Sequence, residues 1–199
     1  MRILRLIALA LLVLGLAAVP AAAQNPPPTA LPSQPPAQKS GFSVDELVNA
    51  GHRFFGTVSR GLATVIEKAT SQWGQPNGYI LGQEGGGAFV AGLRYGEGTL
   101  FTRNAGDLRV YWQGPSLGFD IGGEGARTMM LVYDLPSTEA MYQRFAGIDG
   151  SAYFIGGFGM TALTANKIVV VPIRSGIGFR LGASIGYLKF TPKPTWNPL

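Results

Sequence analysis

The chain has 199 residues, no cysteine, one histidine and a formal net charge of +5. Without cysteine, disulfides and thiolate metal centres are excluded, and a single histidine makes an imidazole metal site improbable. The basic residues are scattered singly, so no Lys/Arg cluster marks a nucleic-acid-binding surface. We therefore expect a fold held by its own hydrophobic core, with no metal, cofactor or nucleic acid.

Residues 1–23 have the pattern of a secretory signal peptide. Arg2 and Arg5 precede an apolar run over residues 7–19, and three alanines end at Ala23. The apolar run is short for a membrane span, so we expect export to the periplasm with cleavage near Ala23. Loss of the two arginines would lower the net charge from +5 to +3. An uncleaved anchor is the alternative.

Residues 24–41 contain six prolines and almost no apolar bulk. This composition predicts an extended linker, and a proline-rich ligand for a partner domain is the alternative. One domain is expected over residues 42–192. The tail, residues 193–199, should leave that domain.

A helix is predicted to start at Ser43, which forms a capping box with Glu46. Apolar residues then recur every three or four positions as far as residue 69, as an amphipathic helix requires. Three glycines indicate a kink or close packing against a sheet: Gly51, Gly56 and Gly61. The lone histidine, His52, lies inside this helix, and we expect no catalytic role for it.

The pattern changes after residue 78, where short apolar runs recur every 8 to 12 residues with glycine or asparagine between them. This spacing predicts an all-β sandwich or barrel. The expected strands are 78–84, 87–95, 98–103, 107–113, 116–121, 126–133, 151–158, 167–173 and a bent 176–190. Tight hairpins are expected at 96–98 and 104–106.

The strands differ in how many of their faces are apolar. Residues 107–113 alternate, with Leu108, Val110 and Trp112 on one face, which predicts one buried and one wet face. Residues 168–171 are apolar throughout, so we expect the N-terminal helix to cover that strand. A short helix is predicted from Ser137 to Gly147, closing one end of the barrel. The fold class is mainly β: a small antiparallel barrel with an N-terminal amphipathic helix and one short inserted helix.

Candidate binding residues come from the strands rather than from a motif. The glycine runs 85–87 and 122–125 lack the lysine and hydroxyl of a phosphate loop, and they indicate bulges or strand corners. Four arginines on neighbouring predicted strands could instead line a pocket for an anionic headgroup. With two adjacent aromatic residues, the candidate set is Arg94, Arg103, Arg109, Arg127, Tyr111 and Trp112. Separate surface ion pairs are the alternative.

Three glycine-rich stretches carry a resemblance to a known family. They are Gly92–Gly98 (GLRYGEG), Tyr111–Gly114 (YWQG) and Gly114–Gly125 (GPSLGFDIGGEG). Over residues 42–192 the chain resembles the EipA family of exported envelope-integrity proteins of Gram-negative bacteria. The resemblance implies a small periplasmic β-barrel with packed helices, a role in keeping the envelope intact, and no known enzyme activity.

A weaker similarity is to the SYLF lipid-binding domain. The matching parts are Gly118–Gly122, Met129–Val132 and the alternating glycines of Gly178–Gly186. This similarity implies contact with lipid headgroups or acyl chains. The chain lacks the lysine-rich patch that binding to an anionic membrane surface would use.

These observations predict a non-enzymatic periplasmic protein that supports envelope integrity by binding a lipid or another amphipathic envelope component. A structural module with an envelope protein partner is a further option. One alternative is an integral outer-membrane barrel, which the strand-like residues 178–190 resemble. Another is an enzyme acting on peptidoglycan or glycan, using a pair of carboxylates from Glu84, Glu97, Asp120 and Glu124.

Overall fold

The computed structural model describes residues 41–87, 91–103, 105–117, 126–175 and 186–195. The predicted signal peptide, nearly all of the linker and the glycine run 122–125 lie outside the described residues. So does most of the bent strand predicted at 176–190.

Two helices take the place of the single predicted helix. The capping box of Ser43 and Glu46 is confirmed and starts α1 (Val44–Phe55). Gly56 ends α1 with φ of 76°, a left-handed conformation that glycine adopts without strain, and α2 (Arg60–Trp73) follows. The predicted close packing is found at Gly61, where a Cβ would lie 2.5 Å from the carbonyl oxygen of Gly156.

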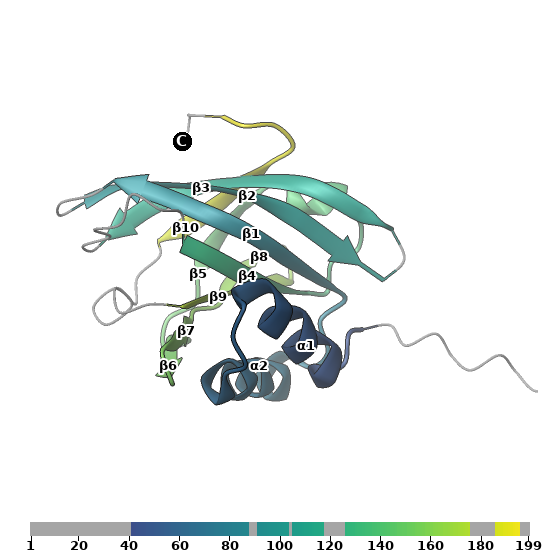
Figure 1. Ribbon diagram of the computed structural model, residues 1–199. Coiled ribbons are helices and arrows are strands. Elements are labelled where there is room, and N and C mark those ends of the chain that lie inside the picture. Colours follow the sequence, from purple (N-terminus) through teal and green to yellow (C-terminus); the bar gives the residue numbers. More distant parts are fainter. Residues whose placement is uncertain (1–40, 88–90, 104, 118–125, 176–185, 196–199) are drawn as a thin grey trace, which may run out of the picture. The chain divides into compact units, whose positions relative to one another are not determined.

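Eight antiparallel strands close into a barrel in the order β4-β1-β2-β3-β10-β5-β8-β9, because β9 also pairs with β4 (Figure 1). The short strand β7 pairs with the end of β9 and carries β6. The strands are β1 (Gly78–Gly87), β2 (Ala91–Thr102), β3 (Asp107–Leu117), β4 (Ala126–Tyr133), β5 (Arg144–Gly147), β6 (Tyr153–Ile155), β7 (Phe158–Met160), β8 (Leu163–Ala165), β9 (Ile168–Ser175) and β10 (Tyr187–Thr191).

Barrel pairing corrects several predicted boundaries. The hairpin at 104–106 is confirmed by the pairing of Phe101 with Asp107, whereas the hairpin at 96–98 is wrong, because β2 continues through it. The strand predicted at 151–158 is split by Gly156 and Gly157, both with positive φ. The run 85–87 forms neither bulge nor corner but regular pairs with β2.

The short inserted helix is reduced to one 3-10 turn, η1 (Glu139–Met141), and the rest of its span becomes strand β5. Phe145 on β5 pairs with Leu188 of β10, and its ring is fully buried in the barrel interior. Pairing on both sides of β5 outweighs the local helical pattern. The buried Met141 of η1 still packs into the interior cluster, as an end-closing element would.

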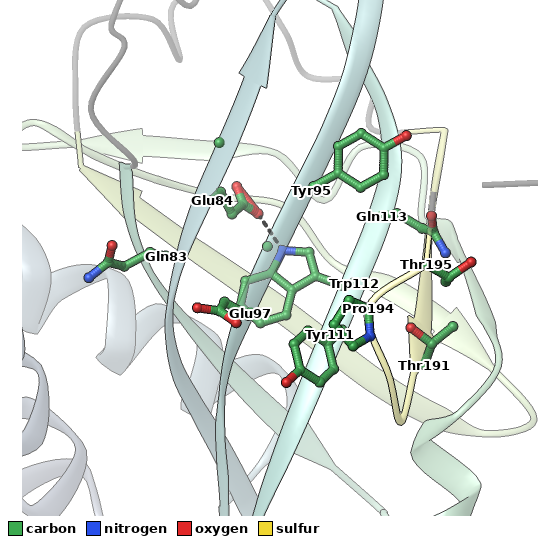
Figure 2. Close-up of a pocket in the computed structure, with 12 residues that line it drawn as sticks. Gln83, Glu84, Tyr95, Glu97, Tyr111, Trp112, Gln113, Thr191, Pro194 and Thr195 are labelled. Atoms are coloured by element: carbon green, nitrogen blue, oxygen red, sulfur yellow. Dashed lines mark hydrogen bonds between the residues drawn. The ribbon is translucent and has the colours of Figure 1, made fainter. Parts of the chain in front are cut away.

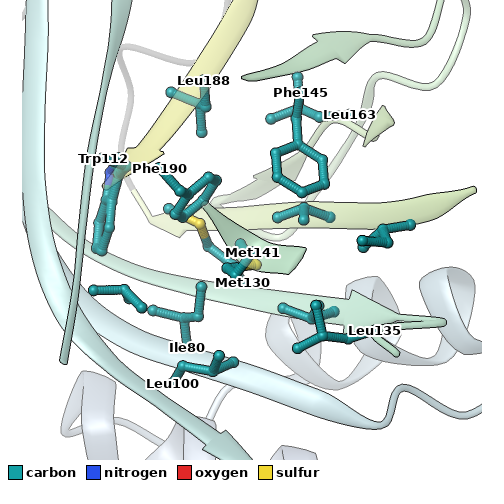
Figure 3. Packing of buried hydrophobic residues seen from close by; sticks show 14 residues of the cluster. Ile80, Leu100, Trp112, Met130, Leu135, Met141, Phe145, Leu163, Leu188 and Phe190 are labelled. Carbon is teal, nitrogen blue, oxygen red and sulfur yellow. The ribbon is translucent and has the colours of Figure 1, made fainter. Parts of the chain in front are cut away.

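Two hydrophobic clusters share strands β4 and β9. Alternate residues such as Met130 and Val170 point into the barrel, where Trp112, Phe145 and Phe190 fill the interior (Figure 3). The intervening residues of both strands pack against α1 and α2 on the outside. The prediction that residues 168–171 are covered on both faces is therefore confirmed. Burial of each such aliphatic side chain contributes roughly 1.5–3 kcal/mol.

Candidate functional site

At one height along the barrel, strands β1, β2 and β3 have an inner face and an outer face that differ in character. Glu84, Gly96 and Trp112 lie side by side across the three strands, and their side-chain positions face the interior. The residues before and after them in sequence face outward, because strand side chains alternate. A buried ion cluster therefore lies on the inside of this row and a groove lies on the outside.

The ion cluster centres on Glu84, whose side chain is 5% exposed. Arg174 of β9 donates two hydrogen bonds of 2.7 Å to its carboxylate oxygens. The indole Nε1 of Trp112 donates a third, at 3.0 Å, and the Nε of Arg94 lies 3.8 Å from Oε2. The carboxylate on β1 thus joins side chains from three other strands of the barrel.

Burial alone would raise the pKa of Glu84, but its ion partners outweigh that effect. The charges of Arg174 and Arg94, with the hydrogen bonds from Arg174 and Trp112, hold the pKa below the ordinary value of 4.5. Glu84 is therefore an ionised structural group. Its predicted partner Glu97 points to the other side of the sheet, so these two do not form a carboxylate pair. Asp120 and Glu124 lie outside the described residues.

Gly96, in the Gly-Glu-Gly sequence of β2, serves packing rather than a turn. A Cβ on Gly96 would lie only 2.2 Å from Cε2 of Trp112. The missing side chain lets the indole ring lie across β2 and reach Glu84 on β1. Glycine here serves close packing inside the barrel.

The groove on the outer face has a volume of about 310 Å³. Its floor is the outer side of the row Glu84–Gly96–Trp112, and the C-terminal segment from Thr191 to Thr195 forms one wall (Figure 2). Side chains facing outward from β1–β3 complete it. The lining residues are Gln83, Glu84, Gly85, Tyr95, Gly96, Glu97, Tyr111, Trp112, Gln113, Thr191, Pro194 and Thr195.

The groove combines aromatic and polar side chains. Tyr95 lies opposite Gln113, and Glu97 lies opposite Tyr111, as two cross-strand pairs. Gln113 is only 1% exposed, and neither its amide nitrogen nor its amide oxygen has a hydrogen-bond partner within the described part of the chain. Glu97 at the rim is paired with Arg109 at 2.9 Å. Such a buried amide without partners is costly unless an occupant supplies them.

The structure does not bring the four candidate arginines into one pocket. Arg94 faces the barrel interior, and Arg109 lies at the groove rim with its guanidinium 6.0 Å from the Tyr111 ring. Arg103 and Arg127 lie at opposite ends of α1. Three of these arginines form separate ion pairs and Arg127 donates to a backbone carbonyl, because arginines on one sheet point to different faces and ends.

Of the aromatic candidates, Tyr111 forms part of the groove wall, and Trp112 contributes to its floor while its ring points inward. Sequence reasoning missed Tyr95, Gln113 and Arg174. The motifs Gly92–Gly98 and Tyr111–Gly114 contain the first two, and their strand alternation is the signal that places both on the outer face.

Arg103 and Arg127 both hold α1 in place. Arg103 pairs with Glu46 in the first turn of α1 and donates to the carbonyl of Gly41. Arg127 donates a 2.8 Å hydrogen bond to the carbonyl of Phe54 in the last turn, where helix carbonyls lack partners. These arginines therefore have structural roles in the domain.

The pKa of Glu46 tests this account of Arg103. The hydrogen bond from Arg103, followed by that from the backbone of Ser43, lowers the pKa of Glu46 from 4.5 to about 2. We expect Arg103→Gln to raise it toward 4.5, measured by NMR titration of the carboxyl resonance. Arg109→Gln, which removes a distant arginine, should leave it unchanged. A Glu46 pKa near 4.5 in the unmodified protein would contradict the pairing.

The described residues contain no cluster of three or more His, Cys, Asp or Glu side chains that could hold a metal ion. Neither α1 nor α2 is long and apolar enough to cross a membrane.

Comparison with protein-family models identifies the family of this chain. The family model described as envelope integrity protein A (EipA) matches residues 40–199. The chain belongs to the EipA family. This confirms the resemblance found in its glycine-rich motifs.

A solved structure supports the fold. The EipA-family chain is similar to a β-barrel-like, uncharacterized protein from Brucella abortus, with 57% sequence identity and a TM-score of 0.76. The match covers 80% of this chain and 99% of the other. No curated protein matches the chain. Membership of the EipA family indicates an envelope-integrity role and an envelope-associated protein.

Proposed function

We propose that this EipA-family protein is exported to the periplasm and supports the envelope by binding an envelope component in the outer groove, without catalysing a reaction. The single observation that carries the groove assignment is the buried amide of Gln113, which lacks a partner within the described residues. Family membership supports the envelope role. The signal-peptide pattern of residues 1–23 supports export.

The groove suits this role better than the barrel interior does. Eight strands leave an interior just wide enough for side chains to fill. Here Trp112, Phe145 and Phe190 occupy it and are all 1% exposed or less. An acyl chain would have to displace packed rings. The groove instead offers both polar groups and tyrosine rings at the surface, as an amphipathic component requires.

Fractionation of cells producing the full chain with a C-terminal tag tests the location. We expect a protein that starts near Gln24, is released with the periplasmic contents and remains soluble in carbonate. Recovery in the carbonate-resistant outer-membrane fraction would overturn the periplasmic proposal and favour the integral-barrel alternative.

Complementation of a deletion strain tests the groove. We expect Tyr95→Ala/Tyr111→Ala to lose protection against detergent stress, because both rings line the groove. Tyr187→Ala is the matched control, since Tyr187 is half-buried on β10 and lies outside the groove lining. Each variant must reach the wild-type level in the cell and the wild-type far-UV circular dichroism. Full protection by the double variant would refute the groove assignment.

A further inference from the structure

We infer that the groove binds a saccharide, through the amide of Gln113 and the rings of Tyr95 and Tyr111. This inference deepens the proposed function and rests on it. It concerns the chemical class of the envelope component, which neither the fold nor the family gives.

The buried amide of Gln113 defines what the occupant must offer. An amide has one oxygen that accepts hydrogen bonds and an NH₂ group that donates two. Both ends of Gln113 are buried and lack partners within the described residues. An occupant that reaches this amide must donate and accept at adjacent atoms, and neighbouring hydroxyl groups of a sugar ring do both.

The two tyrosines provide flat surfaces beside that amide. On strands β2 and β3, Tyr95 lies directly opposite Gln113, and Glu97 lies directly opposite Tyr111. The second pair is two residues away from the first along both strands. That step corresponds to roughly 7 Å along a strand, which is on the scale of one sugar ring. Each tyrosine combines an apolar ring face with a hydroxyl, so it can pack on C–H groups while its edge meets hydroxyls.

The described lining of the groove argues against a ligand recognised through a phosphate. Among the described lining residues there is no lysine or arginine, whereas phosphate recognition relies on such cations. Arg109 at the rim already pairs with Glu97, so the two charges offset each other. A hydroxyl-rich ligand fits this lining better than a lipid phosphate does.

Strand pairing argues against a peptide added to the sheet. β1 pairs with β4 and β2, β2 with β1 and β3, and β3 with β2 and β10. An extended peptide that adds a strand needs an unpaired edge, and the groove lies over the middle of these paired strands. Recognition must therefore come from side chains.

Two envelope sources offer this chemistry, and titration calorimetry on the mature full-length protein distinguishes them. One probe is peptidoglycan glycan strands freed of peptide, and the other is the lipid-free polysaccharide released from lipopolysaccharide. Vesicles of phosphatidylethanolamine and phosphatidylglycerol are a third probe. We expect saturable binding of one saccharide and none of the vesicles. Binding of the vesicles alone, or of nothing, would overturn the inference.

The variant Gln113→Leu separates a binding role from a structural one. It removes an amide without partners from a buried position, so we expect thermal stability to stay equal or to rise. We expect saccharide affinity to fall at least tenfold, while Tyr187→Ala binds as wild type does. Unchanged affinity in Gln113→Leu would place the saccharide elsewhere and overturn the inference.

Failure of the saccharide inference can be distinguished from failure of the proposed function. If Tyr95→Ala/Tyr111→Ala loses envelope protection but neither saccharide binds, the groove function stands and the saccharide assignment is wrong. If the double variant protects cells fully, the groove function itself is wrong, and saccharide binding would lose its role.

Discussion

Glu84→Gln is expected to destabilise the domain by about 3–5 kcal/mol, because it leaves buried guanidinium groups without their carboxylate. Arg174 would lose at least one of its two hydrogen bonds to the carboxylate, and Arg94 would lose its ion pair with Glu84. The amide of glutamine can accept from one donor but carries no charge to offset the two arginines. Urea denaturation at pH 7 followed by circular dichroism measures this loss.

Glu97→Gln is the matched control, because Glu97 lies on the neighbouring strand but faces outward. Its ion pair with Arg109 is 54% exposed on both sides, and exposed pairs contribute about 1 kcal/mol or less. Equal destabilisation by Glu84→Gln and Glu97→Gln would refute the view that the interior cluster is a buried structural centre.

The same carboxylate makes a pH prediction. The pKa of Glu84 is lower in the folded protein than its ordinary value of 4.5 in the unfolded chain. Its stabilising contribution is therefore complete above about pH 4.5 and is lost as the pH falls through the folded-state pKa. Wild-type stability should fall in acid with a component that Glu84→Gln lacks. Parallel pH–stability curves for the two proteins would contradict this.

Gly96→Ala is expected to cost about 3 kcal/mol or more. A Cβ 2.2 Å from the Trp112 ring cannot be accommodated, so the indole must move. Overpacking of a core costs roughly 1–3 kcal/mol, and loss of the Trp112 hydrogen bond to the charged Glu84 adds to it. Urea denaturation measures the stability loss.

Gly85→Ala provides the control, because no heavy atom lies within 4 Å of a Cβ at that position. It is a strand glycine on β1, next in sequence to Glu84, and its substitution should leave stability nearly unchanged. If Gly96→Ala were as stable as Gly85→Ala, the account of Trp112 packing across β2 would be wrong.

Local signals predicted those parts of the fold that depend on neighbouring residues. The capping box at Ser43 and the alternation of residues 107–113 are read from a few adjacent positions, and both are found. The apolar run 168–171 indicated burial on both faces, and helix and barrel cover it. The prediction of an inserted helix from Ser137 to Gly147 was wrong, because pairing with the distant strand β10 places Phe145 in β5.

The site depended on information that local patterns lack. Alternation shows which residues share a face, but barrel closure decides which strands become neighbours. Glu84 and Arg174 are 90 positions apart, and only the pairing of β4 with both β1 and β9 brings them together. Gln113 lay on the face predicted to be wet, and it is nevertheless fully buried beside Pro194 and Thr195 of the C-terminal segment.

The central claim is that the outer groove is where this EipA-family protein meets the envelope, and NMR of the mature protein tests it most directly. The measurement follows the side-chain amide resonances of Gln113 while envelope saccharides are titrated in. We expect progressive, saturable shifts of the resonances of Gln113, Tyr95 and Tyr111, while the resonances of interior residues such as Phe145 stay unchanged. Shifts confined to the barrel interior or to α1 and α2, with Gln113 unchanged at saturation, would contradict it.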